Sequence, residues 1–422
     1  MAQHPFAFRD FRFFWTARLC STLAQNTLVI VVGWQVYDLA RRTMDTKDAA
    51  LQLGFVGLAQ FVPLFVLTLV TGWAADRFDR RLIICLTTSL QLLCAAVLGL
   101  LTWTGAASLH ALMAVAVFLG VARAFSMPAL NALGPNIVPP EVLPHAIATN
   151  AIAGRVGSIL GPAMGGYLYA WSAPLPYAAS VALFVLSLTC MVLLRPIRRV
   201  IGEPRKPWLL MIEGLAYVRN NKIVLGAISL DLFAVLLGGA TAMLPIYARD
   251  ILHVGPAGLG HLRAAPAAGA MATALLFAWR PLKHNVGVKM LLSVAVFGLA
   301  TVIFGVSRWL PLSLACLVVL GASDMLSVYV RQSLMQLSTP DEMRGRVGAV
   351  SSLFISASNE LGEAESGFLA AAIGPVPAVV FGGIGAIIIT GLWAWWFPVL
   401  RQAKTFESTA NGQGTANGSD GA

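Results

Sequence analysis

Four long apolar runs constrain this chain more than any other feature of its sequence. They cover residues 51–75, 82–103, 223–247 and 376–400. Each run exceeds the ~20 residues that a helix needs to cross the hydrocarbon of a bilayer. Only 11% of the 422 residues are charged, against roughly 25% in a soluble domain, and hydrocarbon is the surrounding that penalises charge. The sequence therefore predicts an all-α membrane protein.

Twelve transmembrane helices are expected from the whole apolar pattern. They lie near residues 13–39, 51–75, 82–103, 109–132, 144–170, 175–195, 223–248, 257–279, 286–307, 310–332, 346–372 and 376–400. An even number puts both termini on one side. With both termini in the cytoplasm, twenty Lys and Arg residues, Arg331 among them, are assigned to cytoplasmic segments and five to outer segments. Such an excess is typical of cytoplasmic loops, so the net charge of +10 indicates orientation in a membrane rather than a nucleic-acid partner.

A polar connection near the middle of the chain suggests how the domains divide. It covers residues 196–221, with basic residues followed by a short amphipathic stretch, which is typical of a helix lying on the membrane surface. We expect an N-terminal six-helix bundle at 1–196, a cytoplasmic linker with an amphipathic helix at 197–222, and a C-terminal six-helix bundle at 223–400. Residues 401–422 are rich in Gly, Asn, Ser and Thr and are predicted to be a disordered cytoplasmic tail.

The two halves of the chain are related by an internal repeat. A shift of 201 residues places Gly120 on Gly321 and Gly161 on Gly362. The consistent offset matters more than any single match, because glycine is common in this chain. Duplicated bundles around a central path are a transporter architecture, so the sequence predicts two pseudo-symmetric bundles.

A first motif lies in the loop after the second expected helix. It contains Gly72, Asp76, Arg77, Arg80 and Arg81 within ten residues. Gly72 permits close approach of a neighbouring backbone, and Asp76 can meet the positive N-terminal end of another helix or an arginine. Ordinary basic residues of a cytoplasmic loop would explain the arginines alone, but not their clustering with the glycine and the aspartate.

A second motif lies in the fifth expected helix. Gly157, Gly161 and Gly165 recur every four residues and share one helix face, followed by Gly166, while Pro162 removes one helical hydrogen bond. Such a stripe of glycines lets two helices pack backbone to backbone in lipid. Tight packing alone would explain the stripe, although the complete pattern G-x-x-x-G-P-x-x-G-G is much rarer than a glycine stripe.

These motifs resemble those of the major facilitator superfamily. The first is similar to its loop signature G-x-x-x-D-R-x-G-R-R, with Asp79 where the superfamily usually has glycine, and the matching loop of the second half has Trp279 in place of the acid. The second resembles its antiporter signature, found mainly in exporters. Segments beginning at Asp231, Arg331 and Asn359 look like the branch that contains bacterial enterobactin exporters. The resemblance implies the major facilitator fold, alternating access, and a cytoplasmic latch formed by the first motif.

Ionisable groups inside the expected helices are functional candidates because charge is costly there. The candidates for carrying a proton are Asp231, Glu360 and Asp324. The candidates for substrate binding or charge pairing are Arg155, Arg123, Arg263, Arg18 and Asn26. Burial raises the pKa of a carboxyl group and a nearby arginine lowers it, so alternation between the two makes a proton switch. A static Arg155–Asp231 pair is the alternative, and Arg123 with Asp324 is expected to form a structural or gating pair.

The sequence as a whole favours a proton-coupled exporter of a small amphipathic molecule, siderophore-like or drug-like. It would work as a monomer in the bacterial inner membrane, with a small-molecule substrate, protons and the lipid bilayer as partners. An importer of the same fold and a non-transporting receptor or scaffold remain alternatives. The chain has no G-x-x-x-x-G-K-[ST] phosphate loop and no H-E-x-x-H cluster, so neither an ATP-driven pump nor an enzyme is expected, and neither a metal nor a cofactor.

Overall fold

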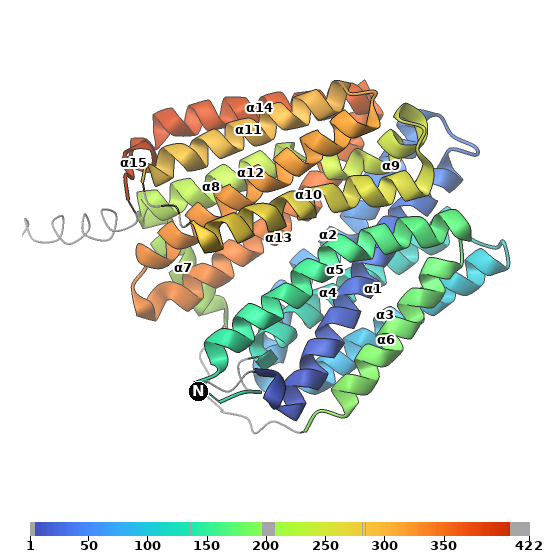
Figure 1. Cartoon of the computed structure of the whole chain (residues 1–422), viewed down its shortest axis with the longest axis horizontal. Helices are drawn as coiled ribbons and strands as arrows, with labels where there is room; N and C mark the ends of the chain where they lie inside the picture. Colours follow the sequence, from blue (N-terminus) through green and yellow to red (C-terminus); the bar gives the residue numbers. More distant parts are fainter. Residues whose placement is uncertain are drawn as a thin grey trace, which may run out of the picture. The chain divides into compact units, whose positions relative to one another are not determined.

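The computed structural model describes residues 5–134, 137–139, 141–195, 207–280, 282 and 284–405, and its regular elements are helices (Figure 1). The first half contains η1 (Pro5–Ala7), α1 (Arg9–Ala40), α2 (Thr46–Arg77), α3 (Arg80–Trp103), α4 (Leu109–Leu133), α5 (Leu143–Trp171) and α6 (Leu175–Val192). The second contains α7 (Pro207–Asn220), α8 (Lys222–Leu237), η3 (Ala240–Met243), α9 (Leu244–Ile246), η4 (Tyr247–Ile251), α10 (Gly255–Trp279), α11 (Val286–Val306), α12 (Leu310–Leu337), α13 (Asp341–Ile373), α14 (Pro375–Trp396) and α15 (Pro398–Gln402). The predicted tail lies outside the described residues from position 406 onward, as do residues 197–206 of the predicted linker.

Within the described ranges, ten helical segments are long and apolar enough to cross a membrane. Two further helices, α5 with 29 residues and α13 with 33, also exceed the length of a span. The first carries the glycine–proline motif, and the second carries Glu360. Together these segments correspond to the twelve helices predicted from the sequence.

The seventh predicted helix, at 223–248, is confirmed as a candidate span over Lys222–Ile251, but it is not regular α-helix throughout. Regular α-helix ends at Leu237, and the chain passes through Gly238 and Gly239 into η3, α9 and the π-helical turn η4. Two consecutive glycines weaken a helix by roughly 1 kcal/mol each relative to alanine. Both are closely packed: a Cβ on Gly238 would lie 2.6 Å from the ring of Phe297, and Gly239 lies against Ser366.

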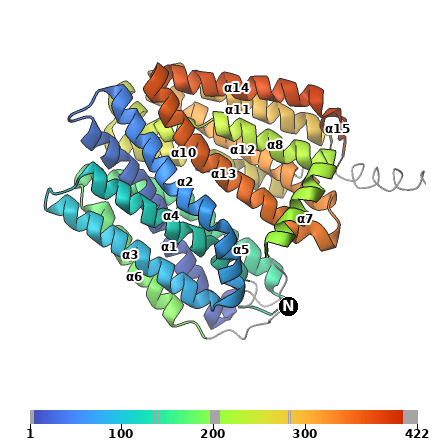
Figure 2. The same ribbon diagram turned by 180° about the vertical axis from the view of Figure 1, so that it is seen from behind.

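The chain forms two compact units, which are described separately. Unit 1 comprises Met1–Pro204 with Leu244–Ala264, and unit 2 comprises Arg205–Met243 with Ala265–Ala422. In unit 1, α1 packs along both α5 and α6, while α4 packs on α2 and α3. Figure 2 shows α3 and α6 running side by side. Phe14 of α1, Ile84 of α3, Leu133 of α4 and Met191 of α6 share one buried apolar cluster.

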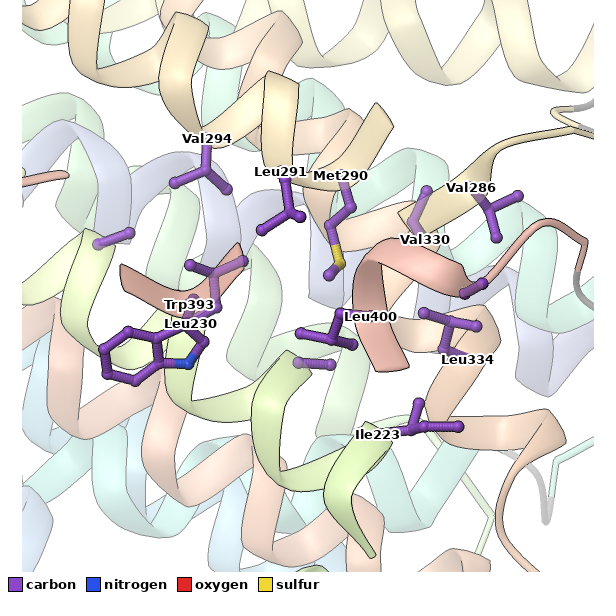
Figure 3. Close-up of a cluster of buried hydrophobic side chains, with 13 residues drawn as sticks. Ile223, Leu230, Val286, Met290, Leu291, Val294, Val330, Leu334, Trp393 and Leu400 are labelled. Carbon is purple, nitrogen blue, oxygen red and sulfur yellow. The ribbon is translucent and has the colours of Figure 1, made fainter. Parts of the chain in front are cut away.

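In unit 2, α11 packs on α12 and α14, and α8 packs on α13 and α14. Figure 3 shows the apolar cluster at their centre, which includes Met290 of α11, Val330 of α12 and Leu400 of α15. Trp393 of α14 borders this cluster and donates its indole N–H to the hydroxyl of Ser229 on α8, at 3.0 Å. The cluster joins α8, which carries Asp231, to α11, α12, α14 and α15.

Glycines at repeat-equivalent positions make equivalent contacts in the two units. Gly120 of α4 lies against the backbone of Gln60 on α2, and Gly321 of α12 lies against the backbone of Pro266 on α10. In the same way, Gly161 of α5 packs on α1, and Gly362 of α13 packs on α8. The close approach that glycine permits therefore recurs between corresponding helix pairs, as the sequence repeat predicts.

Candidate functional site

A buried ion pair lies at the centre of unit 2. Asp231 on α8 pairs its carboxylate with the guanidinium of Arg331 on α12, and their side chains are only 8% and 3% exposed. Buried charges are stable only when they are paired. The pairing explains how α8 carries an aspartate in an otherwise apolar face.

Asp231 and Asp324 line the same small cavity. Its volume is about 10 Å³, close to the space that a single water molecule occupies. Ser323 and Ser327 of α12 contribute to its polar wall, and Phe297 of α11 to its apolar wall. Two carboxylates, two hydroxyls and the ion pair of Asp231 thus meet at a site of restricted volume.

The structure pairs Asp231 with Arg331, a partner that the sequence interpretation did not consider. The static Arg155–Asp231 pair, which that interpretation kept as an alternative to a proton switch, stays a prediction, and Arg155 is exposed on α5. Arg331 had been assigned to a cytoplasmic segment because it lies near the end of a predicted span. It is buried because α12 continues for six residues beyond Arg331, to Leu337. The sequence contained one sign that Arg331 is not an ordinary loop residue. It lies seven residues after Asp324 on the same helix.

The other predicted intramembrane residues occupy different surroundings. Glu360 is buried on α13, with 5% exposure. Arg123 on α4 and Arg263 on α10 are half-buried, and the expected pair of Arg123 with Asp324 stays a prediction. Asn26 donates its amide to the carbonyl of Thr22 on its own helix, at 2.8 Å.

The glycine stripe of α5 lies directly against α1. A Cβ would lie 2.6 Å from Thr22 at Gly157, 2.7 Å from Asn26 at Gly161, and 2.6 Å from Ile30 at Gly165. Thr27 of α1 donates its hydroxyl to the carbonyl of Gly161 at 2.9 Å, which fixes the register of the two helices. The predicted backbone-to-backbone packing is therefore present.

Two residues of this motif, Pro162 and Gly166, extend the contact to a third helix. A Cβ on Gly166 would lie 2.5 Å from the carbonyl oxygen of Pro256 at the start of α10. Gly260 of α10 in turn approaches the carbonyl of Pro162. The motif therefore packs α5 on α1 with one face and on the beginning of α10 with another.

The loop signature between α2 and α3 is only partly described, since the surroundings of Gly72 and the side chain of Asp76 lie outside the described part. Arg77 is exposed and Arg80 is half-buried. Arg81 donates to the carbonyl of Met191 at 2.9 Å and also to that of Val192, at the end of α6. A cation at a helix C-terminus satisfies free carbonyls and the helix dipole, so Arg81 has a structural contact within unit 1.

Asp79, which departs from the superfamily signature, has a clear local role. It is the N-cap of α3, and its carboxylate accepts the backbone N–H of Arg81 at 2.9 Å. Aspartate is among the best N-cap residues, and glycine is nearly as well tolerated there. The substitution therefore keeps the start of α3 intact.

Unit 1 also contains a charge network that the sequence interpretation missed. Asp250 of η4 accepts hydrogen bonds from the hydroxyl of Tyr37 and from Arg41, the latter at 2.9 Å, and Arg249 pairs with Asp38 at 2.6 Å. The network ties η4 to the end of α1. Its cations had been counted only as outer-loop charges, because the contact joins residues more than 200 positions apart.

The chain resembles known transporters over nearly its whole length. Residues 2–413 match the family MFS_3, described as "Transmembrane secretion effector". The enterobactin exporter EntS of Escherichia coli strain 536 is 28% identical over 416 residues, covering 97% of this chain and 96% of that protein. The enterobactin exporter EntS of Citrobacter koseri is 28% identical over 388 residues, covering 90% and 89%.

Solved structures of transporters share the fold. A bacterial homologue of the human lysosomal transporter Spinster, in an inward-facing and occupied conformation, matches with a TM-score of 0.70 at 14% identity, covering 94% of this chain and 97% of that chain. The POT family transporter PepTSo matches with a TM-score of 0.72 at 12% identity, covering 95% and 99%.

Proposed function

Because the chain belongs to the major facilitator superfamily, in its family of transmembrane secretion effectors, we propose that it exports a small amphipathic molecule in exchange for protons. It is a multi-pass secondary transporter and not an enzyme. Beyond family membership, we propose the direction of transport, the coupling ion and the class of substrate. The proposal also places the protein in the bacterial inner membrane as a monomer with both termini in the cytoplasm.

The buried pair of Asp231 and Arg331 is the observation that carries the proposal. The two opposite charges attract each other and join α8 to α12 inside the unit, where an unpaired charge would be costly. Protonation of Asp231 cancels the attraction between α8 and α12 and leaves Arg331 without a counter-charge. Asp324, on the same small cavity, is placed to receive either the proton or the released arginine. Proton binding is thereby linked to the packing of two helices.

Two further observations support export. The glycine–proline segment of α5 has the pattern of the antiporter signature, and it packs tightly on α1. The curated relatives at 28% identity are named as exporters of a siderophore, which motivates siderophore-like or drug-like substrates. Glu360, buried on α13, is the second proposed proton carrier.

The test uses inverted membrane vesicles that contain the full chain. Respiration acidifies their interior, and acridine orange quenching reports the pH gradient. Three aromatic probes are added separately: anionic 1-naphthalenesulfonate, neutral 1-naphthalenesulfonamide and cationic ethidium. We expect at least one probe to release the quench only when the protein is present. The matched control Glu141→Gln, an exposed carboxylate outside the helices, should respond as wild type does.

Asp231→Asn should abolish the release of quenching. Breaking a buried pair costs about 3–5 kcal/mol, so this variant could also lose its fold. The double variant Asp231→Asn/Arg331→Gln removes both charges and restores stability, and it should still lack coupling. Probe-dependent proton movement in the double variant at the wild-type rate would remove Asp231 from the mechanism. If none of the three probes releases the quenching in vesicles with the wild-type protein, proton-coupled export of this class of molecule is contradicted.

A further inference from the structure

A second cavity, in unit 1, is large enough for a small molecule. Its volume is about 320 Å³, at the lower end of the roughly 300–1,000 Å³ that ligand pockets occupy. Its lining residues come from α1, α4 and α5, of which α1 packs extensively on α5 and less extensively on α4. Its polar lining side chains are Arg18, Asn131 and Asn150.

The polar side chains of this cavity have unused hydrogen-bonding capacity. Nη1 of Arg18 and Oδ1 of Asn150 are both buried from solvent and have no hydrogen-bond partner among the described residues. Buried polar atoms are nearly always satisfied in folded proteins, and each exception asks for an explanation. A ligand oxygen that accepts from the Arg18 guanidinium would supply one for Nη1, whereas Oδ1 of Asn150 is itself an acceptor and would need a donor group on the same ligand.

The charge of Arg18 is not neutralised by the walls of the cavity. The described lining contains one cation and no carboxylate. Asp10, the acid that precedes Arg18 on α1, lies eight residues away, or ~12 Å along the helix axis, which is beyond the length of an ion pair. A guanidinium with free donors in a partly dry site selects an anion with two or three acceptor oxygens.

The other walls of the cavity are apolar, and they favour an anion that carries an apolar group. Phe11 and Phe14 are fully buried on one side, and Leu143, Ala146 and Ile147 of α5 form the other, with Ile147 exposed at the rim. Aromatic and aliphatic walls with a few polar groups are the usual composition of a small-molecule site. A free inorganic anion would leave these walls uncovered.

We propose that this cavity binds a small organic anion, a carboxylate or sulfonate carried on an apolar aromatic body. Arg18 holds the anionic group, Asn131 and Asn150 orient it, and Ile147 with the other aliphatic residues of α5 lies against the apolar body. The inference rests on the proposed function only in naming this anion as the transported substrate. Binding itself requires no proton gradient and does not involve Asp231.

Isothermal titration calorimetry tests the proposal on the full chain in phosphatidylcholine nanodiscs, with 1-naphthalenesulfonate as the probe. We expect saturable binding at one site, and about tenfold or greater weakening for neutral 1-naphthalenesulfonamide, because a hydrogen-bonded charge is lost. Inorganic phosphate alone should bind at least as weakly as the neutral probe. Binding of both neutral and anionic probes with equal affinity would overturn the proposal.

Arg18→Gln should weaken 1-naphthalenesulfonate about tenfold or more and leave the sulfonamide unchanged. Arg18→Lys should recover part of the affinity, because it keeps the charge. Arg12→Gln, an exposed arginine on the same helix, is the matched control and should bind as wild type does. Wild-type affinity in Arg18→Gln would refute the site, and the measurement stands whether or not the vesicles show proton coupling.

A lipid headgroup is the competing source of an anion. Replacing part of the phosphatidylcholine with phosphatidylglycerol distinguishes the two. The proposed site should bind 1-naphthalenesulfonate equally in both kinds of nanodisc. Loss of probe binding in phosphatidylglycerol, restored by dilution with phosphatidylcholine, would assign the cavity to a lipid and overturn the inference.

Discussion

Gly161→Ala is expected to destabilise unit 1, although alanine is the better helix former. The new Cβ would lie 2.7 Å from Cβ of Asn26 and 2.9 Å from the carbonyl oxygen of Leu23. Carbon atoms pack at about 3.5–4.0 Å, so α1 would have to retreat by roughly 0.7 Å or more. That movement also lengthens the hydrogen bond from Thr27 to the carbonyl of Gly161.

The magnitude follows from two opposing terms. Overpacking of this kind costs about 1–3 kcal/mol, and replacement of glycine by alanine inside a helix returns up to about 1 kcal/mol. We expect a net loss of about 1–2 kcal/mol, or roughly 2–8 °C in the melting temperature of a unit of this size. Thermal unfolding in detergent, followed by intrinsic tryptophan fluorescence, measures the change.

Gly154 on the same helix provides the matched control. A Cβ there would meet nothing within 4 Å, so Gly154→Ala should keep only the gain in helix propensity and melt a few degrees higher, by about 2–4 °C. The two variants should therefore move in opposite directions. A melting temperature for Gly161→Ala equal to or above that of Gly154→Ala would refute the claim that the glycine stripe sets the distance between α1 and α5.

Two further outcomes are expected from the contacts in unit 1. Asp79→Ala should lower the free energy of unfolding by about 1 kcal/mol, measured by thermal unfolding. Asp79→Gly restores the usual residue of the loop signature and should cost only about a few tenths of a kcal/mol. Equal losses in the two variants would show that the N-cap is not the cause. Asp250→Asn removes the negative charge that pairs with Arg41. Amide hydrogen exchange across η4 should accelerate only several-fold, because a partly exposed ion pair contributes about 1 kcal/mol or less. Exchange across α6 should be unchanged. Exposed Asp48→Asn serves as its control, and unchanged exchange across η4 would show that the network does not hold this turn.

Much of the architecture could be predicted because the bilayer imposes strong rules on sequence. Hydrocarbon requires long apolar helices, so the positions of the helices follow from composition. Close helix packing in lipid requires small residues, so the spacing of Gly157, Gly161 and Gly165 indicated the contact with another helix. The repeat of Gly120 at Gly321 indicated equivalent packing in the two halves for the same reason.

The partners of the buried charges could not be predicted, because pairing depends on how helices are rotated about their axes. Counting charges assigned Arg331 to a cytoplasmic segment. Near the end of a span, the sequence does not show whether a side chain faces water or an aspartate. The cavity beside Arg18 was equally hidden. Its walls come from three helices, and only the fold brings Asn131 and Asn150 to the same place as the arginine.

The break after α8 has a mechanical consequence that a continuous helix would not have. The chain passes from unit 2 to unit 1 between Met243 and Leu244, and it returns between Ala264 and Ala265. Each passage lies close to residues that weaken a helix: Gly238 and Gly239 before the first, and Pro266 directly after the second. The segment between the passages is bound to unit 1 by Asp250 and by the packing of Gly166 on Pro256. If the proposed transport works by alternating access, one unit would move against the other, and residues that weaken a helix beside both passages would lower the cost of bending the chain there, the second time within the continuous helix α10.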